Sequence, residues 1–83
     1  MLIAAENLAY ALMQELQFDA ALELWRTIDA YSEPRASVHL AKARCLAELG
    51  SESEAREELE TAVSLDASAI NLIEDDVVLS SCW

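Results

Sequence analysis

The stretch FDAALELW at residues 18–25 has a counterpart in ESEAREEL at residues 52–59, which lies 34 residues further along the chain. Both stretches place alanine at the fourth position and a large apolar residue at the eighth. Self-similarity at about 34 residues on a helical pattern is typical of repeated helix–turn–helix units rather than of a single closed core. Further pairs at the same spacing are Ala9 with Ala43, Leu12 with Leu46, and Ile28 with Ala62.

The single proline and the single glycine predict the ends of one helix. Pro34 follows Ser32 and Glu33, where a helix start is expected. Gly50 follows Leu49, where a left-handed helix end is expected. Apolar residues recur at helical spacing between the two, at Val38, Ala41, Cys45 and Leu49.

A second helix is expected to follow Gly50 directly. Ser51 and Glu54 have the spacing of a capping box at its start. The helix is expected to end near Asp66. Its predicted buried residues are Ala55, Leu59, Ala62 and Val63.

The first half of the chain repeats this plan. A helix is predicted over residues 2–15, and 17–19 form the turn, where Asp19 is expected to cap the following helix. The predicted inner face of the first helix is Leu8, Ala9, Leu12 and Leu16. The second helix is expected to pack through Leu22, Trp25 and Ile28.

The C-terminal residues 67–83 give a divided signal. A short fifth helix is predicted to begin near Ala67 and to cover the open end of the array, with Ile70, Ile73 and Val77 on one face. We expect a frayed tail after it. The β-branched run at 77–79 leaves open a short strand paired with a partner.

Composition excludes several classes of function. The net charge of −11 argues against nucleic acid and against an anionic membrane surface as partners. Cys45 and Cys82 have no metal or redox spacing, so reduced thiols and a cytoplasmic location are expected. We find no catalytic set, phosphate loop or metal motif, and therefore predict no enzyme activity, no cofactor and no metal.

Several of these residues occupy the positions that a known repeat requires. In the second copy they are Ala43, Gly50, Ala55, Leu59 and Ala62; in the first they are Leu8, Ala9, Leu12, Ala21 and Trp25. Over about residues 5–68 the chain resembles the tetratricopeptide repeat (TPR) family. It departs from the family pattern at Leu16, where the turn glycine is expected, at Lys42, where a leucine is usual, and at Ala67, where a proline is usual.

The resemblance implies an all-α fold of two TPR-like repeats in a right-handed array with a C-terminal capping helix. Repeat 1 would span about 2–32, repeat 2 about 34–66, and the capping helix and tail about 67–83, all within one domain. The segment 43–55 also resembles the small TPR-type chaperones of bacterial type III secretion. Those chaperones keep export substrates soluble, which implies a protein partner of that kind.

In TPR proteins the first helix of each repeat lines a concave binding surface. The resemblance places these partner-binding residues there: Ile3, Asn7, Tyr10, Met13, Gln14, Leu40, Ala41 and Arg44. Tyr10 and Met13 are either adaptable anchors for a ligand or packing residues against the first helix of the next repeat. The Lys and Asn residues that clamp a C-terminal Glu-Glu-Val-Asp peptide in some members are missing, because Glu6, Tyr10 and Ala41 stand in their places.

Two functions follow as expectations. The first is a protein–protein interaction module that binds a peptide or amphipathic helix, such as an export substrate or a co-chaperone, in this groove. The second is a structural subunit or array fragment that acts through self-association, since arrays of fewer than three repeats leave apolar helix faces uncovered.

Overall fold

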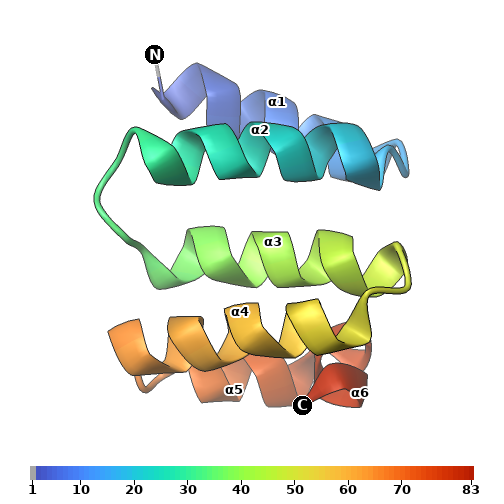
Figure 1. Cartoon of the computed structure of the whole chain (residues 1–83), viewed down its shortest axis with the longest axis vertical. Coiled ribbons are helices and arrows are strands. Elements are labelled where there is room, and N and C mark those ends of the chain that lie inside the picture. The colour runs from blue at the N-terminus through green and yellow to red at the C-terminus, as the bar shows by residue number, and fades with distance from the viewer. Residues whose placement is uncertain (1) are drawn as a thin grey trace.

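The computed structural model describes residues 2–83, with side chains described from Ala4 onward, and this part of the chain contains helices and no strand. The predicted all-α fold is confirmed. Helices that follow one another in sequence pack side by side, so α1 to α4 form a stack with α5 and α6 at its lower end (Figure 1). The helices are α1 Leu2–Gln14, α2 Phe18–Ala30, α3 Ala36–Glu48, α4 Glu52–Leu65, α5 Ala69–Asp75 and α6 Val77–Cys82.

The turn between α1 and α2 closes with two backbone hydrogen bonds. Gln17 N donates to Leu12 O at 2.9 Å, and Leu16 N donates to Met13 O at 3.0 Å. Leu16 has φ of 63°, in the left-handed region. This is a Schellman ending, which uses a left-handed residue to satisfy the last carbonyl groups of a helix.

The turn between α3 and α4 is built in the same way. Ser51 N donates to Leu46 O at 2.8 Å, and Gly50 N donates to Ala47 O at 3.1 Å. Gly50 has φ of 87°, as predicted for a glycine at a helix end. Every atom pair in this turn is 34 residues from its counterpart in the first turn, so the spacing seen in the sequence corresponds to a repeated backbone geometry.

The helix starts differ from the sequence prediction. Gln17 and Ser51 precede α2 and α4 with nearly the same backbone angles, but neither side chain makes a capping hydrogen bond. The predicted cap at Asp19 is wrong, because Asp19 lies inside α2 and its carboxylate accepts from the adjacent Ala20 N. The predicted capping box of Ser51 with Glu54 is likewise not formed.

Alanines and a few large side chains make the core. Small residues at helix crossings allow the backbones to approach to about 8–10 Å, and large residues fill the adjoining space. The fully buried alanines are Ala9, Ala21, Ala43, Ala55 and Ala62. The largest fully buried side chains are Trp25, Ile28, Leu59, Ile73, Val38 and Cys45.

The first helix buries less than the sequence predicted. Ala9 is fully buried, but Leu8 is 55% exposed and Leu16 is 73% exposed. α1 lies at the end of the stack, where no further helix of residues 2–83 covers its outer side (Figure 1), which leaves Leu8 exposed. Leu16 is exposed because its left-handed backbone forms the turn.

The C-terminal segment is ordered into two short helices. The predicted fifth helix is present as α5, but the expected frayed tail and the strand are both wrong, since residues 77–82 form α6. Asp76 caps α6 by accepting from Val78 N at 2.9 Å and Leu79 N at 3.1 Å. Leu79 and Cys82 are buried against α3 and α4, whereas Val77 is exposed. None of the described helices has the length and apolar character needed to cross a membrane.

Candidate interaction groove

Three of the predicted partner-binding residues meet at one hollow. Met13 and Gln14 at the end of α1 and Arg44 on α3 line a cavity of about 290 Å³ beside the first turn. Its remaining lining residues are Leu16, Phe18 and Glu48. The hollow therefore combines an apolar wall from the first turn with polar and charged groups from both helices.

Tyr10 and Met13 both pack against α2 while keeping part of their surface free. The Tyr10 ring meets the Trp25 ring edge-on, with 4.9 Å between ring centroids. The Trp25 indole Nε1 donates to Met13 Sδ at 3.3 Å. Tyr10 remains 46% exposed, so the packing fixes its orientation without removing it from the surface. Both residues therefore pack, but against α2 rather than against the first helix of the second repeat, α3. Tyr10 also keeps part of its surface exposed.

Arg44 is tied to the C-terminal helix. Its Nη1 donates to Asp76 Oδ2 at 3.0 Å, and Asp76 uses its other oxygen to cap α6. Arg44 Nε is buried and has no hydrogen-bond partner in the described part of the chain. The Arg44 guanidinium thus joins α3 to α6 at the edge of the hollow and has one donor unsatisfied.

The other predicted groove residues do not line this hollow. Asn7 and Leu40 lie on α1 and α3, Asn7 exposed and Leu40 half-buried against the core. Ala41 is only 6% exposed, so its prediction as a contact residue is wrong. It is buried because α3 lies between α2 and α4 and has little free surface. The side chain of Ile3 lies outside the described residues.

Three residues of the hollow were not among the predicted partner-binding residues. Leu16 and Phe18 flank the first turn, and Glu48 is the last residue of α3. Leu16 and Phe18 could have been found in the sequence as two apolar residues at a predicted turn. Leu16 was instead expected on the inner face of the first helix, and 17–19 only as the turn. Glu48 had no signal beyond its place one turn after Arg44.

A cluster of four charged or titratable side chains lies on the opposite side of α3. Lys42 Nζ is 3.0 Å from Asp29 Oδ2 and 3.4 Å from Glu58 Oε1. His39 places Nδ1 2.7 Å from Glu58 Oε1 and Nε2 3.6 Å from Asp29 Oδ1. Both α3 side chains are about nine-tenths buried. The cluster joins α2, α3 and α4, and its signal in the sequence was the lysine at a position where the repeat favours leucine.

Both cysteines are free and buried. Cys45 is fully buried, and burial raises the pKa of its thiol from about 9 to about 11. Cys82 is buried in α6. A cysteine nucleophile works as the thiolate, so Cys45 is a packing residue at neutral pH, as predicted. Elsewhere, the Ser68 hydroxyl and amide donate to Asp66 in the turn after α4 and lower the pKa of that carboxyl.

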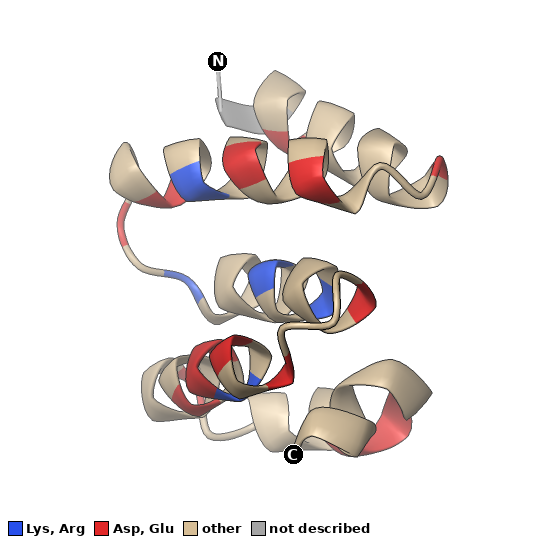
Figure 2. Cartoon of the chain, turned by 45° about the vertical axis from the view of Figure 1, so that its right-hand side comes forward, with Lys and Arg blue, Asp and Glu red and all other residues tan. Residues whose placement is uncertain are grey.

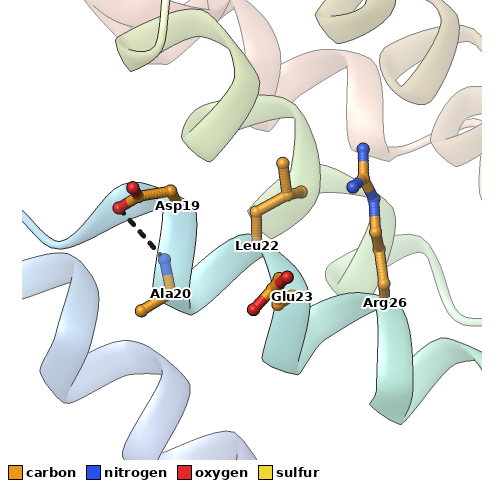
Figure 3. Close-up of a pocket in the computed structure, with 5 residues that line it drawn as sticks. All are labelled: Asp19, Ala20, Leu22, Glu23 and Arg26. Carbon is orange, nitrogen blue, oxygen red and sulfur yellow. Dashed lines mark hydrogen bonds between the residues drawn. The ribbon is translucent and has the colours of Figure 1, made fainter.

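A second hollow, of about 400 Å³, lies along α2 (Figure 3). Its lining residues all come from this one helix: Asp19, Ala20, Leu22, Glu23 and Arg26. Leu22 and Arg26 extend from the same side of α2 in Figure 3, one turn apart. A surface formed by a single helix offers no facing wall to hold a ligand, so the hollow between α1 and α3 remains the candidate site.

No group of three or more potential metal ligands is present among residues 2–83. Comparison of the chain with protein-family models, with curated proteins and with solved structures finds no match. The case for function therefore rests on the geometry of this molecule.

Proposed function

We propose that this chain is a TPR-like protein–protein interaction module. Its ligand is a peptide or amphipathic helix that places one apolar side chain in the hollow between α1 and α3. The observation that carries the proposal is the meeting of Met13, Gln14 and Arg44 around an apolar wall. A hollow of about 290 Å³ lies at the small end of ligand pockets, which suits a single side chain better than a whole metabolite.

The chemistry of the lining supports such a ligand. Met13 is flexible and polarisable and adapts to apolar side chains of different shapes. The Gln14 amide, exposed beside it, offers both donors and an acceptor to a ligand backbone. The unsatisfied Nε of Arg44 gains a partner if the guanidinium turns toward a carbonyl oxygen of the bound chain.

The resemblance of segment 43–55 to the type III secretion chaperones narrows this proposal. Under it, the ligand is a segment of an export substrate that the chain keeps soluble before secretion. The repeated turn geometry and the acidic surface support a small helical module of this type.

The test is capture of partner proteins from source cells, followed by a comparison of two variants. Gln14→Arg places a long charged side chain at the mouth of the hollow, on an exposed residue. Asn71→Arg makes the same kind of change on the exposed surface of α5, outside the hollow. We expect Gln14→Arg to weaken binding of the captured protein more than tenfold, and Asn71→Arg to leave it unchanged. Equal binding by the two variants would refute the groove as the site.

A further inference from the structure

One face of α1 carries small and apolar side chains that nothing in the described structure covers. Ala4, Leu8 and Ala11 follow helical spacing and are all exposed. In Figure 1, α1 lies at the end of the stack opposite α5 and α6. We call Ala4, Asn7, Leu8 and Ala11 the α1 stripe.

The repeat itself indicates that this stripe is an interface. The residues 34 positions later are Val38, Ala41, Lys42 and Cys45, and all four are buried in α3, which packs on α2. The same helix face is therefore covered by a helix inside the stack and bare at its end. The α1 stripe is the equivalent surface at the end of the stack. A further helix could therefore pack on it as α2 packs on α3.

The α1 stripe is complementary to itself. Its two alanines stand at equal distances from a midpoint between Asn7 and Leu8. A second α1 laid antiparallel places Ala4 against the partner's Ala11 and Leu8 against the partner's Asn7. Small residues at both ends of the contact allow the close approach of helix axes that Ala9, Ala21, Ala43 and Ala55 provide within the fold. Two-fold pairs of this kind are the commonest oligomers.

Charge also favours this face. The chain carries a net charge of −11, so two copies repel each other over most of their surfaces. α1 contains a single acidic residue, Glu6, which is neutralised by Arg35 at 2.7 Å. By contrast, α4 contains five glutamates. Figure 2 shows the difference, with acidic residues concentrated away from α1. Two copies therefore repel each other less through α1 than through α4.

We propose that two copies of this chain form an antiparallel dimer through the α1 stripe. The proposal goes beyond the groove and does not depend on it, because Met13 lies on the opposite side of α1 and Gln14 lies beyond Ala11, at the C-terminal end of the helix. One helix from each copy buries less surface than the ~1,200–2,000 Å² of a stable interface. The dissociation constant is therefore expected to be on the order of tens of micromolar. Added salt screens the repulsion and strengthens the dimer.

Sedimentation equilibrium over about 10 μM to 1 mM brackets the expected dissociation constant. Leu8→Glu places a charge at the centre of the α1 stripe and is expected to weaken dimerisation more than tenfold. Leu72→Glu is the matched control, because Leu72 is 60% exposed on α5 at the opposite end of the molecule. A monomer over the whole range overturns the proposal, and so does equal weakening by the two variants.

Cross-linking tests the antiparallel register. Ala4→Cys and Ala11→Cys are prepared separately, mixed in equal amounts and oxidised. The expected product is the mixed disulfide dimer of the two variants, whereas predominant Ala4→Cys homodimer overturns the antiparallel arrangement. Leu8→Glu should still bind the protein captured through the groove. If this variant remains dimeric and instead loses a captured protein, the α1 stripe has another occupant and the proposal fails.

Discussion

The two helical hairpins, α1–α2 and α3–α4, share a backbone and differ at equivalent side chains. Their turns make the same hydrogen bonds 34 residues apart, although one uses Leu16 and the other Gly50 at the left-handed position. Lys42 is buried in α3, while its counterpart Leu8 is exposed in α1. The 34-residue spacing therefore specifies the backbone and the alanine contacts. The place of a hairpin in the stack decides which other positions are buried.

The largest effect is expected at Trp25, which is equivalent to Leu59 in the second hairpin. Both side chains are fully buried. Trp25→Ala should lower the free energy of unfolding by about 3–5 kcal/mol, and much of this chain would then be unfolded. Leu59→Ala should lower the free energy of unfolding by less. Trp25, unlike Leu59, also packs against the partly exposed Tyr10 and donates a hydrogen bond to Met13. Urea unfolding followed by helical circular dichroism measures both. A larger loss for Leu59→Ala would show that the second hairpin holds the main core.

The next effect concerns the buried cation that distinguishes α3 from α1. Lys42→Leu gives α3 the residue that α1 has at the equivalent position, but it leaves Asp29 and Glu58 without their lysine. We expect a loss of roughly 2–3 kcal/mol, since removing one partner of a buried ion pair leaves an uncompensated charge.

A double-mutant cycle with Asp29→Asn identifies the origin of that loss. The coupling energy between Lys42 and Asp29 is expected to be roughly 1–3 kcal/mol. The control pair is Arg56 with Glu60, an exposed pair 4.0 Å apart on α4, for which a coupling below about 0.5 kcal/mol is expected. Additive effects of Lys42→Leu and Asp29→Asn would mean that the lysine acts through packing alone.

The two turns allow a smaller and more direct comparison. Leu16→Gly should stabilise the chain by about 1 kcal/mol, because glycine removes the steric cost of a left-handed backbone at φ of 63°. Gly50→Ala should destabilise by a similar amount for the same reason, although the space around its Cβ is open. Denaturant midpoints at constant slope give both values. If both substitutions had the same sign, strain at the turns would not explain the difference between the hairpins.

The sequence was sufficient for the backbone because its signals were local and repeated. The alanine pairs and Gly50 predicted four helices and one turn correctly. The first turn has the same geometry at the position expected from the 34-residue spacing, although Leu16 stands there in place of glycine. The capping prediction at Asp19 was wrong because α2 already begins at Phe18. Ser51 does precede α4, but its backbone angles of φ −94° and ψ 66° lie outside the extended region usual for a capping residue, and its side chain makes no capping hydrogen bond. α6 was missed because its start depends on Asp76, whose second oxygen contacts Arg44 far away in sequence.

The candidate site could be predicted only in part. The repeat register put Met13, Gln14 and Arg44 among the expected groove residues, and all three line the same hollow. The rest of the hollow is formed by Leu16, Phe18 and Glu48. These residues lie at the first turn and at the end of α3, and the spacing along one helix face does not predict such positions. The ion cluster could not be predicted from the sequence, because Asp29, Lys42 and Glu58 come from three different helices and meet only in the folded chain.

The smallest effect concerns Cys45, whose equivalent in α1 is the exposed Ala11. The pKa of the buried thiol is about 11, above its ordinary value near 9. Between these values the unfolded chain binds fewer protons than the native one, so the free energy of unfolding falls as pH rises. The expected loss is about 1 kcal/mol by pH 10.

The control for that prediction is Cys45→Ala, which keeps a small apolar residue in α3 and removes the thiol. Its own stability is lower, but its stability should change less between pH 8 and about pH 10 than that of the unsubstituted chain. Ala11→Cys provides the reverse comparison, because an exposed thiol keeps nearly the same pKa in the native and unfolded chains and adds no such slope. Identical slopes for Cys45→Ala and the unsubstituted chain would mean that the Cys45 thiol is not held protonated by burial.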